Sequence, residues 1–241
     1  MAAINNVVIG IQARSTSKRF PRKVFEILDG RPLIQHVIDA CKSCQTYINT
    51  YPDGYRTFVS TALLVPYDDE LTKAYSHKIQ IIEGPDDDVL TRYKMASDQL
   101  TPDYVVRITA DCPLMKADLI RKHIMMAIKF KYAYCSNVDP VGRTAIDGHD
   151  VEGMSRRALD WLNETATDLS DREHVTTLLR TSAIPGDFMS GFVMGNLNQS
   201  HIKLSVDTPE DLEHVKCEYF RRRDSYSAAV GKFGKRHVHN Y

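Results

Sequence analysis

The sequence predicts an α/β fold with a doubly wound, mostly parallel sheet, and three observations carry this prediction. Residues 7–11 form a short apolar run that is typical of a buried strand, and residues 56–61 and 79–82 are also interpreted as strands. The segments between them, 32–43 and 68–76, have the apolar spacing or the acidic start of helices. A polar, basic loop follows the first strand at once, where such sheets bind phosphates. The resulting β-α-β-α-β order is the first half of a doubly wound sheet.

The rest of the chain continues this alternation without an interdomain linker. We predict strands at 104–109, 132–137, 150–154, 192–196 and 201–206, and helices at 89–100, 116–129, 156–164, 168–180 and 213–223. We expect one domain over residues 1–225, followed by a basic tail at 226–241. The long stretch between 138 and 200 predicts a small excursion that closes the site or contacts a second copy.

The composition of the chain limits the classes of function that it can have. The 241 residues are 43% hydrophobic and 26% charged, as in ordinary globular proteins. The formal net charge is zero, so no overall field favours nucleic acid or a membrane. We find no bilayer-length apolar run and no signal-peptide pattern. Five cysteines without a disulfide framework predict a reducing, cytoplasmic location, and Cys41 and Cys44 are interpreted as ordinary helix cysteines rather than a redox or zinc pair.

The loop after the first strand is strongly basic. Five cations and three hydroxyls fall within ten residues: Arg14, Lys18, Arg19, Arg22 and Lys23, with Ser15, Thr16 and Ser17. Guanidinium and ammonium groups bind polyanions through short charge-assisted hydrogen bonds. The loop lacks the glycine patterns of common phosphate loops, so side chains must replace backbone amides here. On charge alone, an exposed basic loop or a nucleic-acid patch remains an equal alternative.

Aspartates stand at the ends of two predicted strands. Asp111 follows strand 104–109 and Asp207 follows strand 201–206, each before a proline-containing helix start. The ends of parallel strands share one edge of a sheet, so we expect these carboxylates to lie close together and to repel without a cation. Asp111 is well placed to bind a hard cation, and a helix cap is the alternative for both residues.

Two further groups are ambiguous. Asp86, Asp87 and Asp88 precede the helix at 89–100, and a capping role is favoured over a metal site. Arg107 lies on the strand before Asp111. It either contacts a nucleotide or pairs with the acidic segment 86–88, and the residues alone do not choose.

Eight short motifs follow one another between residues 7 and 220. They are Ile11-Gln12-Ala13-Arg14 with Ser17, Arg19, Pro21 and Lys23, then Gly30–Ile34, Asp87–Tyr93, Val106–Leu114, Ser136-Asn137, Asp150–Glu152, Asp171–Thr176 and Val206–Leu212. Together they resemble the sugar-activating cytidylyltransferases, the superfamily of the CMP-KDO and CMP-sialic acid synthetases, and most closely its spore-coat-polysaccharide branch. The chain departs from the sugar-acid synthetases at Gln12, where they have proline, and at Ala110, where they have glycine. These departures indicate the branch and leave the acceptor open.

The resemblance implies a Rossmann-like fold of the nucleotide-diphospho-sugar transferase type and an activity. That activity is Mg²⁺-dependent transfer of a cytidylyl group from the co-substrate CTP to a sugar acid or sugar-phosphate-like acceptor, with release of pyrophosphate. It implies nucleotide-binding roles for Gln12, Ala13, Arg14, Ser17, Arg19, Lys23, Arg107 and Asp111. Asp111 and Asp207 would hold one or two Mg²⁺, and with Arg14 and Lys23 they form the expected catalytic set.

The acceptor side is less specific. The resemblance implies acceptor contacts by Asp150, Glu152, Arg172 and His174. By chemistry alone, the segment around Arg172 is equally well a helix start with Asp171 as cap and His174 as a packing histidine. We expect a homodimer that binds neither a membrane nor nucleic acid.

Two other functional classes stay open. A glycosyltransferase on a similar fold could use Asp86 and Asp88 as an Asp-x-Asp metal motif, although the basic loop would then be unnecessary. A non-catalytic phosphate- or RNA-binding module could use the basic loop, although the pair Asp111 and Asp207 argues against it.

Overall fold

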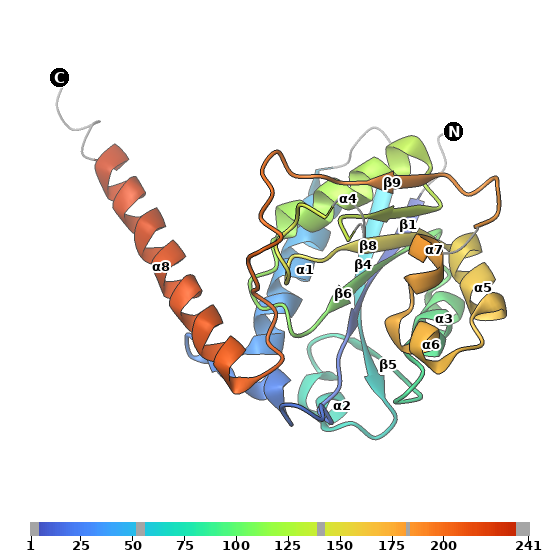
Figure 1. Cartoon of the computed structure of the whole chain (residues 1–241), viewed down its shortest axis with the longest axis horizontal. Helices are drawn as coiled ribbons and strands as arrows, with labels where there is room; N and C mark the ends of the chain where they lie inside the picture. Colours follow the sequence, from blue (N-terminus) through green and yellow to red (C-terminus); the bar gives the residue numbers. More distant parts are fainter. Residues whose placement is uncertain (1–4, 52–55, 139–142, 182–183, 235–241) are drawn as a thin grey trace.

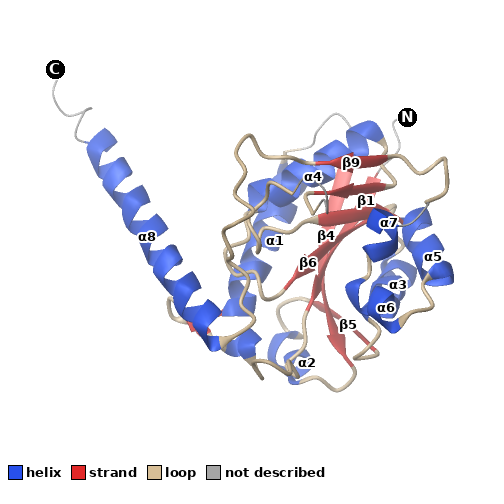
Figure 2. Cartoon of the chain, viewed as in Figure 1, coloured by secondary structure: helices blue, strands red, loops and turns tan. Residues whose placement is uncertain are grey.

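A seven-stranded sheet with helices on both faces forms the body of the protein, and helix α8 projects from it (Figures 1 and 2). The computed structural model describes residues 5–51, 56–138, 143–181 and 184–234, with the backbone alone at 225–234. The strand order is β5-β4-β1-β6-β8-β7-β9. The strands are β1 (Asn5–Gln12), β4 (Thr57–Pro66), β5 (Gln80–Gly84), β6 (Tyr104–Thr109), β7 (Tyr134–Ser136), β8 (Glu152–Ser155) and β9 (Ser190–Phe192). Of these, β8 alone runs antiparallel to its neighbours, so the doubly wound, mostly parallel sheet is confirmed.

The helices lie in two layers. α1 (Leu33–Thr50) and α4 (Ala117–Phe130) cover one face, and α3 (Val89–Leu100) and α5 (Arg156–Thr165) cover the other. The remaining elements are α2 (Glu70–Tyr75), α6 (Leu169–His174), α7 (Thr177–Thr181), α8 (Pro209–Gly234), the 3-10 turn η1 (Lys23–Phe25) and the hairpin strands β2 (Ile27–Leu28) and β3 (Arg31–Pro32). None of these helices, over the ranges described, is long and apolar enough to cross a membrane.

Strand β1 shows how the sequence builds both cores. Val7, Ile9 and Ile11 are buried with α1, whereas Val8 is buried with α3, because successive side chains of a strand point to opposite faces. A third, smaller core joins the start of α8 to the body, and Leu212 and Val215 lie in it. Packing therefore fixes both faces of the sheet, and it also fixes the start of α8 against the body.

Two predicted strands are wrong or shifted. Residues 201–206 form no strand of the sheet, because β9 takes the edge position. They lie along two other loops, through a bridge between Asp147 and Lys203 and a hydrogen bond from Val206 N–H to Asp111 O (2.9 Å). The strand predicted at 192–196 is β9, which ends at Phe192.

Two predicted helices also differ. The helix predicted at 168–180 is two short helices, α6 and α7, because Val175 adopts a positive φ of 63° that ends the first. Its cap is Asp168 rather than Asp171. The last helix continues to Gly234, since residues 210–230 contain neither glycine nor proline to end it. It thus includes part of the predicted tail, and residues 235–241 of that tail lie outside the described residues.

Candidate active site

Lys23 stands at the centre of the candidate site. It begins η1, directly after Arg22, which adopts the left-handed conformation (φ 60°). Its side chain is 11% exposed, and its ammonium donates to Asp111 Oδ2 (2.8 Å), Asp207 Oδ1 (3.1 Å) and Val206 O (2.7 Å). These bonds use all three donors of an ammonium. The fold therefore brings together three residues that are far apart in the sequence.

Neither aspartate caps a helix. α4 follows Lys116, which makes no side-chain cap bond. At the start of α8, Asp211 Oδ2 accepts from the N–H groups of Asp207 (2.9 Å) and Thr208 (3.1 Å), and Thr208 Oγ1 accepts from Asp211 N–H (3.3 Å). This reciprocal arrangement is a capping box. It leaves the Asp207 carboxylate free to face Lys23.

An ammonium between the carboxylates replaces the repulsion that the sequence predicted. Burial lowers the pKa of Lys23, but the carboxylates of Asp111 and Asp207 outweigh burial and hold this pKa above its ordinary value. Burial would raise the pKa of Asp111, and Lys23 instead holds it below its ordinary value. Asp207 Oδ1 also pairs with Arg19 (2.9 Å), and its Oδ2 lies 3.5 Å from Lys203. The carboxylate pair is thus surrounded by cations.

The donors around Lys23 fit a hard divalent cation. Two carboxylate oxygens and the Val206 carbonyl already converge on one positive charge. The described residues contain no cluster of three or more His, Cys, Asp and Glu side chains. Mg²⁺ is commonly held by only one or two carboxylates, with substrate phosphates and water as the other ligands. The donor set suits a metal that binds together with a nucleotide.

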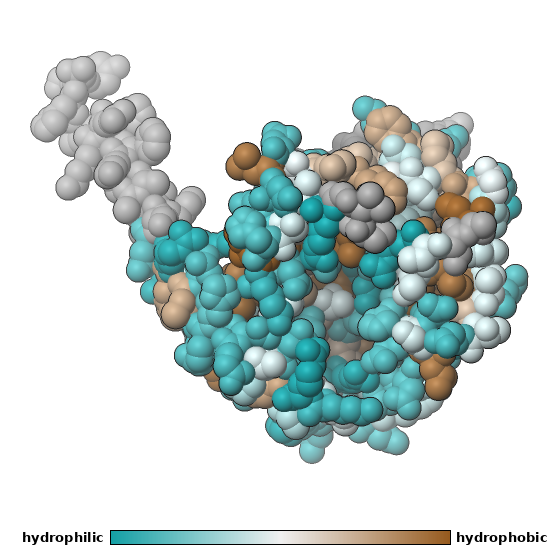
Figure 3. Space-filling view, viewed as in Figure 1, coloured by the Kyte–Doolittle hydropathy of each residue, from teal (hydrophilic) through white to brown (hydrophobic). Residues whose placement is uncertain are grey.

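Acidic residues hold the basic loop in place. Arg14 donates to Glu173 (3.0 Å) and lies 3.8 Å from Asp86. Ser15 donates to Asp69 through its backbone N–H (2.9 Å) and its hydroxyl (3.1 Å), and Asp69 also caps α2. In Figure 3, the surface is hollowed between α6 and the segment that leads to α8, and the rim of this hollow is mainly hydrophilic. The Arg14–Glu173 contact ties the loop to the α6 side.

The remaining loop residues differ in exposure. Arg19 is the most open of the predicted phosphate ligands, with 68% of its side chain exposed, and Arg14 is 34% exposed. Ser17 is half-buried on the same loop. Ala13 is buried, and its N–H donates to Leu64 O (3.0 Å). Solvent-facing guanidinium groups and a fixed backbone are suited to receiving an anion.

Arg107 joins the first strand to the second half of the chain. Its Nε donates to Gln12 Oε1 (2.9 Å), and its guanidinium pairs with Glu152. It therefore does not pair with the acidic segment 86–88, which was one of its two predicted partners. Glu152 is buried and also accepts from Tyr134 (2.7 Å) and Thr176 (2.6 Å). This buried network joins β1, β6, β7 and β8 beside Gln12.

The predicted acceptor residues fall in different settings. All five donors of Arg172 are used within the chain, by Asp88, Thr91, Asn163 and the carbonyl of Ala166. His174 is exposed at the end of α6. Asp150 pairs with Arg143 (2.5 Å), yet burial raises its pKa to about 6. Arg172 is thus fixed by several contacts and Asp150 by its pair with Arg143, while His174 is exposed.

Comparison with known proteins gives the family. The family model described as cytidylyltransferase matches residues 7–228. This chain belongs to the cytidylyltransferase family. It is 25% identical over 224 residues to the spore coat polysaccharide biosynthesis protein SpsF of Bacillus subtilis, covering 90% of this chain and 87% of that protein. The predicted family and enzyme class, a nucleotidyltransferase, are confirmed.

Solved structures give the same fold. A cytidylyltransferase of Leptospira borgpetersenii superposes with a TM-score of 0.73 at 21% identity, over 87% of this chain and 84% of that one. A CMP:2-keto-3-deoxy-manno-octonic acid synthetase complexed with CTP superposes with a TM-score of 0.65 at 14% identity, over 90% and 99%. The two other functional classes lose their support. In particular, Asp88 caps α3 by accepting from Thr91 N–H (2.8 Å), as predicted, so an Asp-x-Asp motif is not needed to explain it.

One buried cation of this cytidylyltransferase, beside the basic loop, was not among the predicted site residues. Arg92 is 2% exposed, donates to Ala13 O (3.2 Å) and Leu64 O (3.4 Å), and makes no ion pair among the described residues. Its neighbour Tyr93 donates to Gly10 O (2.9 Å). A Cβ at Gly10 would lie 2.6 Å from the Tyr93 ring, so glycine is needed there. The available signal was a cation inside an apolar helical stripe, three residues after Val89.

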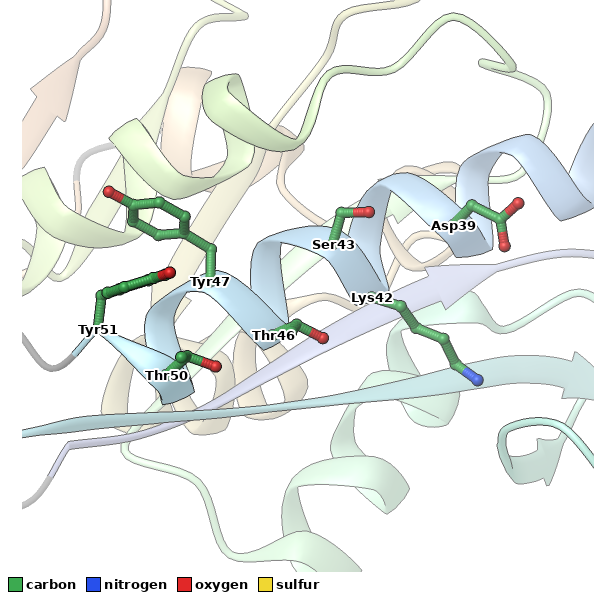
Figure 4. Close-up of a pocket in the computed structure, with 7 residues that line it drawn as sticks. All are labelled: Asp39, Lys42, Ser43, Thr46, Tyr47, Thr50 and Tyr51. Carbon is green, nitrogen blue, oxygen red and sulfur yellow. The ribbon is translucent and has the colours of Figure 1, made fainter.

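A shallow depression on α1 is not part of this site (Figure 4). It is lined by Asp39, Lys42, Ser43, Thr46, Tyr47, Thr50 and Tyr51, none of which was predicted to act. The ring centroids of Tyr47 and Tyr51 lie 5.1 Å apart with the rings tilted by 45°, and the Arg121 guanidinium lies over the Tyr47 ring. The predicted helix cysteines of α1, Cys41 and Cys44, are buried and unpaired.

Proposed function

We propose that this cytidylyltransferase transfers CMP from CTP to a hydroxyl of a sugar acid or sugar-phosphate-like acceptor, with Mg²⁺ bound at Asp111 and Asp207. The convergence of both carboxylates and Lys23 beside the basic loop is the observation that supports it most. The name of the SpsF relative supports an acceptor from polysaccharide synthesis. The bound Mg²⁺ would neutralise phosphate charge and lower the pKa of the attacking hydroxyl.

The chain's residues would position the reactants. Arg14, Arg19 and Lys23 would bind the β- and γ-phosphates, and Ser17 would donate one further hydrogen bond. The acceptor oxygen would form a bond to the α-phosphorus while the bond to the leaving pyrophosphate breaks, and the hydroxyl proton would pass to solvent. In such transfers, positioning and charge stabilisation supply most of the rate gain.

On the other side, Gln12, Ala13 and Arg107 would shape the nucleotide site. We keep Asp150 and His174 as candidates for direct acceptor contacts. Glu152 and Arg172 would act indirectly, since their polar atoms are already bonded within the chain. Acceptor contacts by these two residues would require existing bonds to break.

The decisive experiment offers the protein CTP, Mg²⁺ and a pool of sugar acids and sugar phosphates, and detects pyrophosphate. We expect release with CTP that depends on one acceptor class and on Mg²⁺. UTP, ATP and GTP should be used much less, because a base-binding site penalises unpaired polar groups. Equal use of UTP would contradict the proposed nucleotide, and release without any acceptor would contradict the proposed transfer.

We also propose a homodimer in a reducing, cytoplasmic setting. The free cysteines support the setting. Exposed apolar side chains gather on β9 and on the residues before and after it, as expected for a contact between copies: Met189, Phe192, Met194 and Leu197. Light scattering after gel filtration tests the dimer, and a monomeric mass at working concentration would exclude it.

A further inference from the structure

Lys23 holds the position that a metal between Asp111 and Asp207 would need. Its nitrogen lies within 3.1 Å of both carboxylates and within 2.7 Å of the Val206 carbonyl. A cation bound by both carboxylates would therefore lie almost in contact with this ammonium. Like charges at such a distance repel strongly in a partly buried site. The ammonium and a divalent ion exclude one another there.

The same lysine could also contact an anion that binds to the neighbouring Arg19. Arg19 and Lys23 contact the same oxygen of Asp207, at 2.9 and 3.1 Å. Arg19 is largely exposed, so an anion held by Arg19 would lie beside the Lys23 ammonium. Lysine is a compact charge on a flexible stem, and it can exchange carboxylate partners for phosphate oxygens without moving its backbone.

We propose that Lys23 is the resident counter-ion of Asp111 and Asp207, and that it leaves them for a divalent metal only when a nucleoside triphosphate offers it new partners. This inference rests on the metal role proposed above for the two aspartates. It makes metal and nucleotide binding interdependent. The metal alone binds weakly, the triphosphate strengthens its binding, and the metal strengthens triphosphate binding by the same factor.

A counter-ion is needed because the two carboxylates are partly buried. Without a cation, one of two adjacent carboxylates tends to take up a proton, and a buried unpaired charge destabilises the fold. With Lys23 in place, the site keeps both aspartates charged and ready for the metal. The same arrangement keeps free metal ions out until the substrate is bound.

The test measures Mn²⁺ binding without nucleotide, through the electron paramagnetic resonance signal of the free ion. We compare the wild type, Lys23→Met and Lys203→Met. Lys203 is the matched control, because it lies 3.5 Å from Asp207 but bonds chiefly to Asp211 (2.6 Å). Lys23→Met should bind one Mn²⁺ per chain at least about ten-fold more tightly than the wild type, given the charge-assisted bonds it removes. Lys203→Met should stay close to the wild type.

Adding Asp111→Asn to Lys23→Met separates the metal role of the aspartates from the counter-ion role of Lys23. Loss of the tight Mn²⁺ site in the double variant supports both the counter-ion and the proposed metal ligands. If Mn²⁺ binding depends on Asp111 but is equally tight in the wild type and in Lys23→Met, the counter-ion role of Lys23 is wrong and the metal role of Asp111 stands. Binding that ignores Asp111 overturns the metal role and the inference with it. If Lys23→Met does not fold, tight Asp111-dependent binding to the wild type without nucleotide still contradicts the proposal, and weak binding there supports it.

Discussion

At the scale of single residues, Asp111 links stability to chemistry through its contact with Lys23. Asp111→Asn should remove most pyrophosphate release. It should also lower the free energy of unfolding at neutral pH by about 1–3 kcal/mol, because a buried ammonium loses a charged partner. The folded pKa of Asp111 lies below its ordinary 3.8, so this contribution is present above pH 3.8 and disappears as pH falls through the folded value.

Urea unfolding at pH 7 and below pH 3.8 checks this prediction, with Asp207→Asn as the parallel variant. The difference between wild type and Asp111→Asn should shrink in acid. A variant that is less stable at neutral pH yet keeps normal Mg²⁺-dependent turnover would show that Asp111 is only structural.

Asp150 should behave in the opposite way. Burial raises its folded pKa to about 6, so keeping it charged at neutral pH costs stability that is recovered as pH falls from 6 toward 3.8. Asp150→Asn should therefore stabilise the fold at pH 7.5, by up to about 3 kcal/mol for a shift of this size. Thermal unfolding at pH 7.5 and pH 4 measures it, and an equal gain at both values would contradict the assigned cause.

At the scale of elements, α3 fixes the end of β1 through two consecutive residues. Arg92 bonds to the carbonyl of Ala13 beside the basic loop, and Tyr93 bonds to the carbonyl of Gly10 further back on the strand. The first contact lies next to the predicted nucleotide site and the second does not. We therefore expect Arg92 to act as a positioning residue, whereas Tyr93 should serve the fold.

Arg92→Met should raise the KM for CTP by about ten-fold, because the loop loses a charge-assisted bond. Tyr93→Phe should lower the free energy of unfolding by about 1 kcal/mol, because a buried hydrogen bond to the Gly10 carbonyl is lost, and should keep the KM. Steady-state kinetics and urea unfolding on both variants check the pair. Arg92 has no separate role if both variants change only the stability, or if both change the KM for CTP equally. Partial recovery of the KM in Arg92→Lys would support a separate role for Arg92.

At the scale of the whole molecule, α8 divides into a docked start and a projecting remainder (Figure 1). Leu212 and Val215 are buried against the body in the third core. Tyr219 and Arg223 bond to Asp29 in the β2–β3 hairpin, at 2.8 and 3.1 Å. These contacts hold the first part of α8 against the body, and the domain limit at residue 225 stays a prediction.

A chain shortened to residues 1–224 should keep its fold and its CTP-dependent turnover. Its melting temperature should stay within about 4 °C of the full chain, since a loss below 1 kcal/mol shifts it by no more than that. Calorimetry and the pyrophosphate assay measure both quantities, and light scattering shows whether the mass changes. Loss of folding would contradict the domain limit.

The sequence by itself determined the family, most strands of the sheet and the cap at Asp88. Strands such as 104–109 were predicted residue for residue, because a strand covered on both faces is a short, mostly apolar run that the sequence records. The cap at Asp88 was predicted because capping is local chemistry between residues three apart. The motifs that carry the family likewise lie in short, continuous segments.

Only the tertiary structure decided what the charged residues do to one another. It placed Lys23 between two aspartates, paired Arg107 with Glu152, and used every donor of Arg172 within the fold. It also removed 201–206 from the sheet, although that segment has the apolar pattern of a strand. Ion pairs join residues of distant segments through long side chains, and a sheet edge accepts whichever strand fits. Neither the ion pairs nor the choice of edge strand leaves a periodic signal in the sequence, because both depend on how separately formed elements pack.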